Sequence, residues 1–284
     1  MPADLQRDRT AAMRDMLPLG QENNVPLYAC RGRIGNGVHI GRIRSDFPSC
    51  HIGYDGRELE VKPYEVLSLA WVEAANGSIP AQSLSAGQAI DASTGGRFVS
   101  LGLYPCRASY QTGVHVGEVR PGGSGCVFGF GGKEVSVATY EVLQLPSWVA
   151  WTEVSARSLP VDAIVGGSEG GEPLYVCRAA DRNGIRLGKV RANSGGCSIA
   201  SEGRELVVSR FEVPAPRWAR ATASPVLPTS AVPAGRENEG LLYLCRVQRS
   251  GMIQIGKAGP ELSGCHVGMQ GREVVYQEFE VLGR

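Results

Sequence analysis

Four cysteine pairs with identical spacing constrain this chain more than any other feature. In each pair the second cysteine follows the first after 20 residues, and the same side chains surround every pair. A tyrosine lies two positions before the first cysteine, an arginine follows it directly, and a glycine lies 11 positions after it. A Gly-basic-Glu triplet and an aromatic-Glu-Val step close each frame. The pairs are Cys30/Cys50, Cys106/Cys126, Cys177/Cys197 and Cys245/Cys265. Self-similarity at a fixed spacing indicates a repeat architecture, so we predict four copies of one module.

Short runs of β-favouring residues fill the frame. In the run Leu174 to Arg178, alternation places Tyr175 and Cys177 on one face of a strand. Glycine-rich joints separate these runs, and the chain contains 38 Gly and 17 Pro. This pattern predicts an all-β protein. Only residues 3–16 are predicted to be helical.

A single repeat is small for an independent core, because the first cysteines are only 76, 71 and 68 residues apart. A domain of about 60 residues buries only about 60% of its unfolded surface. We therefore predict that neighbouring repeats pair into two compact β-sandwich-like domains. The first would span residues 1–147 (repeats about 17–70 and 71–147) and the second residues 148–284 (repeats about 148–216 and 217–284). Cleavage near residue 147 should then leave two soluble halves, whereas cleavage near 217 should not.

The charge balance restricts the partners of the chain. With 29 basic and 28 acidic residues and a net charge of +1, the composition argues against binding to nucleic acid or to an anionic membrane. No apolar run approaches the roughly 18 residues of a membrane-spanning helix, so no membrane insertion is predicted. Residues 1–16 do not resemble a secretory signal. We therefore predict a cytoplasmic location, with secretion by an unconventional route left open.

The cysteines could form disulfides, pack as buried thiols or bind metal. The chain has no CxxC motif and only four histidines, which makes zinc binding unfavoured, and no metal or cofactor is predicted. Equal spacing and an inward direction suit either a cross-strand disulfide in each repeat or a pair of packed thiols. Because cytosolic proteins keep their thiols reduced, packed thiols are favoured.

The complete frame resembles a known repeat family. Its fullest copy is repeat 3, with Pro173 to Ala179, Gly188 to Val190, Gly196-Cys197, Gly203 to Glu205 and Phe211 to Val213. This combination resembles the DM-nine repeat family, known from oyster-type mannose-binding lectins and from the lectin module of natterin-like proteins. The resemblance extends from about Pro18 to Leu282. It implies that two repeats exchange strands to form one compact β-domain.

The resemblance also implies a sugar site. Family members bind mannose through an acidic residue before the tyrosine strand and the lysine of the Gly-Lys step. The corresponding residues here are Glu22 and Arg42 in repeat 1, Glu169 and Lys189 in repeat 3, and Glu237 and Lys257 in repeat 4. A carboxylate and a cation together can accept from and donate to the vicinal hydroxyls of a hexose. On spacing alone, solvated charges or a surface ion pair are the favoured explanation of these residues. The resemblance and the joint loss of acid and base in repeat 2 make a sugar site an equal alternative.

Repeat 2 departs from this pattern. It has Phe98 and Glu118 at the two positions, so the acid and the base are lost together. In contrast, the arginine after the first cysteine and the Glu of the Gly-basic-Glu triplet occur in all four repeats. We therefore interpret these two as structural and predict an Arg–carboxylate fork between them. Trp71, Trp151 and Trp218 are predicted to pack in the core, and Trp148 to be exposed.

These features favour a soluble, multivalent carbohydrate-binding protein that recognises mannose or mannose-containing glycans without catalysis. The alternative is a non-catalytic protein-interaction or structural repeat protein. An enzyme is least favoured, because neither nucleophile–base pairs nor paired carboxylates recur with the frame. A homodimer is compatible with either function.

Overall fold

The computed structural model describes residues 15–91, 99–182 and 184–284. Within these ranges all helical or extended elements are β-strands and none is a helix, which confirms the predicted all-β class. Of the segment 3–16, predicted to be helical, residues 3–14 lie outside the described residues. Asp15 lies in a turn and Met16 forms an isolated bridge with Ser68, so these two residues are not helical. Among the residues described, there is no helix with the length and hydropathy needed to span a membrane.

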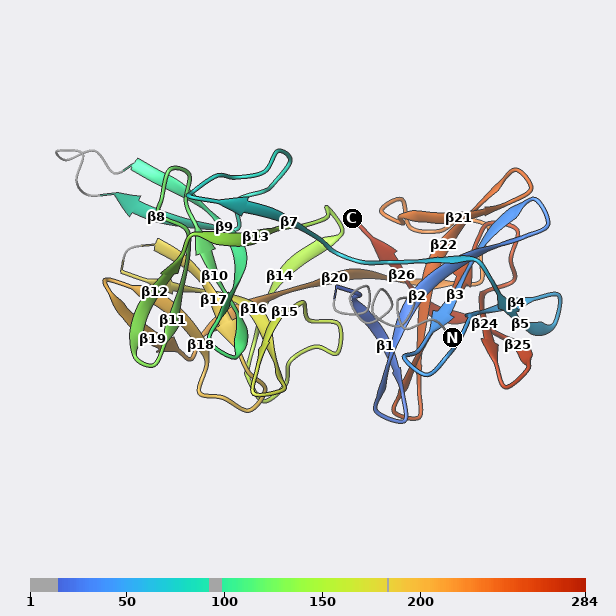
Figure 1. The fold of residues 1–284 in the computed structure, drawn as a ribbon. Coiled ribbons are helices and arrows are strands. Elements are labelled where there is room, and N and C mark those ends of the chain that lie inside the picture. Colours follow the sequence, from blue (N-terminus) through green and yellow to red (C-terminus); the bar gives the residue numbers. More distant parts are fainter. Residues whose placement is uncertain (1–14, 92–98, 183) are drawn as a thin grey trace. The chain divides into compact units, whose positions relative to one another are not determined.

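All four repeats use the same succession of strands (Figure 1). A short strand leads into a long strand that carries the first cysteine, and a third strand folds back on the long one. The second cysteine begins a tight hairpin, after which the aromatic-Glu-Val strand returns to the long strand. In repeat 3 these are β15 (Val165–Glu169), β16 (Glu172–Asp181), β17 (Gly184–Val190), β18 (Cys197–Ser201), β19 (Arg204–Val208) and the first half of β20 (Phe211–Thr222), preceded by the tryptophan strand β14 (Val149–Val154).

The other repeats follow this order. Repeat 1 contains β1 (Pro18–Glu22), β2 (Val25–Ile34), β3 (Gly37–Ile43), β4 (Cys50–Tyr54), β5 (Arg57–Val61) and β6 (Tyr64–Val66). Repeat 2 contains β7 (Ala70–Ala75), β8 (Gly87–Asp91), β9 (Val99–Tyr110), β10 (Gly113–Val119), β11 (Cys126–Phe130), β12 (Lys133–Val137) and β13 (Thr139–Gln144). Repeat 4 uses the second half of β20 and then β21 (Pro233–Glu237), β22 (Gly240–Arg249), β23 (Met252–Ala258), β24 (Cys265–Met269), β25 (Arg272–Tyr276) and β26 (Glu278–Gly283).

A disulfide lies in the small core of each repeat. The two cysteines of every pair are buried and bonded to each other, so the preference for packed thiols is wrong. The Cα atoms of each pair are 5.8–6.0 Å apart, because the long strand and the cysteine hairpin lie side by side. This separation suits a disulfide. In repeat 3 the bridge packs against Ile199, Phe211 and Val213.

The glycine 11 positions after the first cysteine permits this close packing. A Cβ atom at Gly188 would lie 2.0 Å from the carbonyl oxygen of Ser198 on the cysteine hairpin. The equivalent distances at Gly41, Gly117 and Gly256 are 1.9–2.2 Å. Any side chain would therefore push the hairpin away from the strand, which explains why every repeat has glycine here.

The repeats pair differently from the expected division into 1–147 and 148–284. Unit 1 comprises the chain up to Ser68, Ser147–Val149 and Pro216–Arg284, and unit 2 comprises Leu69–Pro146 and Ala150–Ala215. Repeat 1 thus pairs with repeat 4, and repeat 2 with repeat 3. One physical reason lies in β20, a continuous strand that ends repeat 3 and begins repeat 4. An unbroken strand contains no turn at which repeat 4 could fold back onto repeat 3.

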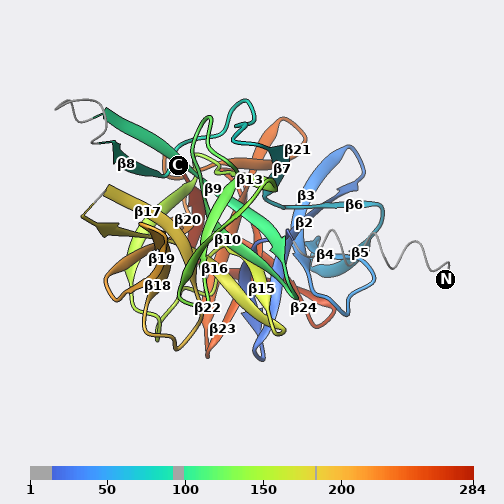
Figure 2. The ribbon, with the colours of Figure 1, turned by 60° about the vertical axis from the view of Figure 1, so that its left-hand side comes forward.

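Paired repeats exchange strands reciprocally, as the resemblance implies. In unit 2, the short strand β15 of repeat 3 pairs with β10 of repeat 2, and β8 of repeat 2 pairs with β17 of repeat 3 (Figure 2). In unit 1, β1 pairs with β23 and β21 pairs with β3. Each repeat therefore completes the sheet of its partner.

The tight turns of paired repeats also bind each other. In unit 2 the Glu205 carboxylate accepts the Gly132 N–H at 2.9 Å, and Glu134 accepts the Gly203 N–H at 3.2 Å. In unit 1, Glu273 and Glu58 accept the N–H groups of Gly56 and Gly271 at 2.9 and 2.8 Å. The Glu of the Gly-basic-Glu triplet thus joins two repeats.

The predicted Arg–carboxylate fork has a different acidic partner. In each repeat the arginine after the first cysteine pairs with the Glu of the aromatic-Glu-Val step, as Arg178 does with Glu212 at 2.7 Å. The two residues lie directly opposite each other on β16 and β20. The structural role is as expected, but the partner is corrected, because the Gly-basic-Glu carboxylate is engaged by the turn of the other repeat.

Candidate functional sites

Each candidate site combines residues from both repeats of a unit. The base lies on the third strand of its own repeat, and the acid lies at the end of the short exchanged strand. The paired repeat adds a side chain nine positions after its first cysteine. These added residues are His39 for repeat 4, His115 for repeat 3, Arg186 for repeat 2 and Gln254 for repeat 1.

In repeat 3, Glu169 and Lys189 line one cavity of about 420 Å³. Arg191, Ser198 and Glu205 also line it. The ammonium of Lys189 lies 2.8 Å from Nδ1 of His115 and 5.5 Å from the ring centroids of Phe128 and Phe130. Glu169 forms an ion pair with Arg191, and no ion pair joins it to Lys189.

Burial controls the protonation of this site. It lowers the pKa of Lys189 to about 8, against the opposing charge of Glu205. Burial and the Lys189 charge also lower the pKa of His115 to about 4. At neutral pH the lysine is therefore charged and the histidine is neutral, so Nδ1 of His115 accepts a hydrogen bond from the ammonium. Because an ammonium has three donors, Lys189 retains donor capacity for a ligand.

Repeat 4 has the same arrangement. The Lys257 ammonium lies 3.0 Å from Nδ1 of His39 and 5.0 Å from the ring centroid of Tyr54. Burial lowers the pKa of Lys257, and the charges of Glu237 and Glu273 oppose this shift. The pKa of His39 falls to about 4 through burial and the charge of Lys257. The predicted acid and base of repeat 4 are thus coupled through their charges.

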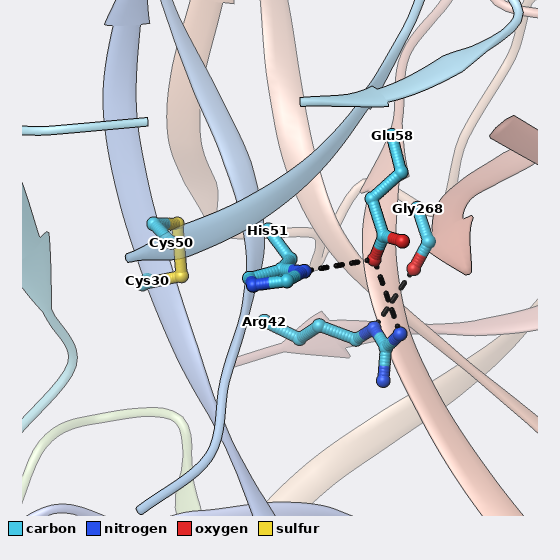
Figure 3. The surroundings of a disulfide bond; sticks show 6 residues. All are labelled: Cys30, Arg42, Cys50, His51, Glu58 and Gly268. Carbon is cyan, nitrogen blue, oxygen red and sulfur yellow. Dashed lines mark hydrogen bonds and ion pairs between the residues drawn. A yellow bond between two sulfur atoms is a disulfide. The ribbon is translucent and has the colours of Figure 1, made fainter. Parts of the chain in front are cut away.

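The site of repeat 1 is closed by its own side chains. Arg42, which is only 3% exposed, pairs with Glu22 and with Glu58 at 3.2 Å each. Its Nε also donates to the carbonyl oxygen of Gly268 at 2.8 Å (Figure 3). The Glu22 carboxylate accepts further bonds from Arg44 and Gln254. A ligand at this site would therefore have to displace existing ion pairs.

Repeat 2 carries a reversed charge at the base position. Glu118 is 2% exposed, forms an ion pair with Arg186 of repeat 3 and accepts the Leu187 N–H at 2.8 Å. Burial raises the pKa of Glu118 to about 7, even against the charge of Arg186. Phe98, at the acid position, lies outside the described residues. Glu118 therefore replaces the cation with a structural ion pair.

The residues contributed by the paired repeat were not predicted from the sequence. One position of the frame holds three residue types, namely His39 and His115, Arg186 and Gln254, so it does not stand out as repeated. The usable signal is complementarity: a histidine faces each lysine, and an arginine faces the glutamate. Among the described residues, no group of His, Cys, Asp and Glu is arranged to hold a metal ion.

Protonation of the two buried histidines, His39 and His115, is expected to destabilise the folded protein in acid. Their folded pKa of about 4 lies below the ordinary value of 6.5, so the unfolded chain binds more protons in this interval. The contribution of each histidine to the free energy of unfolding should therefore fall by about 3 kcal/mol as the pH drops from 6.5 to 4. Glu118, with its pKa raised to about 7, opposes part of this fall between pH 7 and 4.5. Urea unfolding at several pH values measures this. The double variant His39→Gln/His115→Gln should show a shallower dependence, and an unchanged slope would contradict the assignment.

The fold and the sites define a class: an all-β repeat protein whose repeats pair by strand exchange and share polar sites. The DM9 repeat family matches residues 21–94, 100–208 and 189–276, and the chain belongs to this family. The DM9 repeat is known in carbohydrate-binding proteins, and the match indicates no enzyme family.

Among solved structures, the nematode sperm cell motility protein MFP2B is similar, with 15% identity, coverage of 76% of this chain and 74% of that chain, and a TM-score of 0.37. No curated protein matches the chain.

Proposed function

We propose that this protein is a non-catalytic lectin that binds mannose-type glycans at the sites of repeats 3 and 4. The observation that carries the proposal is the shared cavity of Glu169 and Lys189. There a carboxylate can accept hydrogen bonds from sugar hydroxyls, and an ammonium can donate to them. Phe130 also lines the cavity and offers an apolar face to a sugar ring.

The three predicted pairs are expected to differ in affinity. Glu169 with Lys189 and Glu237 with Lys257 have no ion pair to each other, whereas Glu22 and Arg42 are bonded at 3.2 Å. Breaking a buried ion pair is costly because it leaves desolvated charges behind. We therefore expect the site of repeat 1 to bind mannose more weakly than the sites of repeats 3 and 4.

One strong site in each unit makes the protein multivalent. A shallow polar sugar site has an affinity on the order of 1 mM. Two sites that engage the same glycan surface can increase the apparent affinity by about 10²-fold or more, provided that the glycans span them. This multivalency suits pattern recognition on glycan-coated surfaces.

The four disulfides favour an oxidising environment for this function. Of the two locations considered, secretion by an unconventional route suits the bridges better than residence in the cytoplasm.

Substitution at the repeat 3 and repeat 4 sites tests the proposal. Glu169→Gln and Glu237→Gln together should reduce binding to mannan-coated beads at least tenfold, because each removes the acceptor charge of one site. Lys189→Met should weaken binding to the unit 2 site, because it removes the ammonium that donates hydrogen bonds to the sugar hydroxyls. Titration with free mannose measures the intrinsic affinity, and bead binding measures the avidity.

A matched control is Glu153→Gln, which removes an exposed carboxylate of the same unit that pairs with Arg210 outside the cavity. This variant should bind as the parent does. If the double variant binds mannan normally while it remains folded, the sugar site lies elsewhere. If the unaltered protein shows no binding to any mannose-type glycan on an array, the lectin function is wrong.

A further inference from the structure

Among the described residues, repeat 1 lacks the indole cover that the other three repeats have. In those repeats the guanidinium after the first cysteine lies under an indole: Arg107 under Trp71, Arg178 under Trp151 and Arg246 under Trp218, at 4.1–4.6 Å from the ring centroid. The first tryptophan of the chain is Trp71, so repeat 1 has no equivalent. As a result, the Arg31 side chain is 50% exposed, against 2%, 22% and 17% for its counterparts.

An apolar cavity of about 240 Å³ occupies the corresponding position in unit 1. Trp71 lies opposite Leu143 and Trp218 lies opposite Leu282 on paired strands. The residue equivalent to Leu143 in repeat 1 is Leu67, which lines the cavity together with Arg31. The remaining lining is largely apolar and includes Val232, Leu244 and Trp148.

A second cavity, of about 530 Å³, adjoins the first and shares Arg31, Glu65, Pro233 and Ala234 with it. Two further arginines, Arg33 and Arg236, line this cavity, and both are exposed. Among the described residues, no carboxylate pairs with either of them. Glu65 is paired with Arg31 at 2.5 Å. The second cavity therefore carries an excess of positive charge.

In the described part of unit 2, the place equivalent to this cavity lacks both arginines. At the positions of Arg33 and Arg236, unit 2 has Ser109 and Ser168. The exposed arginine, the apolar cavity and the two additional cations thus occur together, in the one place where the indole is missing.

We propose that unit 1 binds a small aromatic acid at this place, separately from the sugar sites. The ring occupies the apolar cavity and stacks on the Arg31 guanidinium, as an indole does in the other three repeats. A guanidinium over an aromatic face is favourable, and more so when it is desolvated. The carboxylate of the ligand lies in the second cavity, where Arg33 and Arg236 donate charge-assisted hydrogen bonds. Together the two cavities have a volume suited to a small ligand.

Calorimetric titration of the full chain with indole-3-acetate tests this site. We expect saturable binding to one site, with indole alone and acetate alone each binding at least tenfold more weakly. The double variant Arg33→Gln/Arg236→Gln should weaken binding of indole-3-acetate at least tenfold and leave binding of indole unchanged. Arg31→Gln should weaken the binding of both indole-3-acetate and indole. The matched control Arg57→Gln removes an exposed arginine of the same unit that does not line the cavities, and it should bind as the parent does.

Several results would overturn the proposal. These are the absence of saturation at millimolar indole-3-acetate, or equal affinity in the parent and the folded double variant. Equal binding of a non-aromatic anion, such as glucuronate or a sulfated monosaccharide, would show that charge alone acts here. Circular dichroism confirms the folding of each variant. Mannan binding should be unaffected by all of these substitutions, so failure here and failure of the lectin function are distinguishable.

Discussion

A fragment spanning residues 69–215 is expected to fold by itself, whereas a fragment spanning 1–147 is not. The first fragment contains repeats 2 and 3, which form unit 2, with both of their disulfides. The second contains one repeat from each unit, so β1 loses β23 and β10 loses β15. In this fragment the buried Arg42 also loses the carbonyl oxygen of Gly268, and the buried Glu118 loses the guanidinium of Arg186. Circular dichroism and urea unfolding of the two fragments measure the difference.

A matched control uses the two parts of unit 1. Segments 1–68 and 216–284, produced together, should associate into one folded complex, because their exchanged strands complete each other. A cooperative unfolding transition for 1–147 as a monomer would contradict the pairing of repeats 1 and 4. This expectation replaces the sequence-based one, in which cleavage near residue 147 separates two intact domains.

Charge complementarity at the paired sites explains why these repeats select each other. In the observed pairs, Glu118 meets Arg186, and Lys189 and Lys257 each meet a neutral histidine. If repeats 3 and 4 paired in the same way, the buried Lys257 would face Arg186. Two like-charged buried groups are strongly destabilising, so a pairing of repeats 3 and 4 is disfavoured. Because repeat 4 cannot then pair with repeat 3, repeat 1 remains available to it.

Reduction of the disulfides is expected to destabilise both units severely. Each bridge closes a loop with a sequence separation of 20 residues. In the chain-entropy account such a bridge contributes about 3 kcal/mol, and each unit contains two. Because small domains have stabilities of about 5–15 kcal/mol, loss of both bridges removes much of the stability of a unit. Urea unfolding with and without reductant measures the effect.

Thiol titration in denaturant provides the control. The oxidised protein should show no reactive thiol, and the reduced protein should show eight, because all cysteines are bridged. The variant Cys177→Ser/Cys197→Ser should destabilise unit 2 and leave the unfolding of unit 1 unchanged. Detection of eight thiols before reduction would contradict the bridges.

The repeat frame predicted the local structure well because local interactions determine it. The recurring Tyr-x-Cys-Arg strand and the tight Gly-basic-Glu hairpin appear in every repeat as expected. The glycine of each frame has a steric reason that is the same in all copies. The frame also located Glu169 and Lys189, which line one cavity.

The acidic partner of the Arg178 fork was assigned wrongly, because Glu205 and Glu212 are both at fixed offsets in the frame. Spacing along the chain cannot distinguish two equally regular carboxylates. The cross-strand register places Glu212 opposite Arg178, and the partner turn engages Glu205. The cysteine state was also missed, since the preference for thiols depended on the predicted cytoplasmic location rather than on geometry.

By itself, the sequence determined the all-β class, the four repeats, the family and the residues of the candidate sugar sites. Each of these follows from residue types at short, regular separations. Only the tertiary structure decided that repeat 1 pairs with repeat 4, that His115 and His39 complete the lysine sites, and that repeat 1 leaves Arg31 uncovered. These features depend on contacts between residues far apart in the chain, where four similar modules offer several pairings and buried charge selects among them.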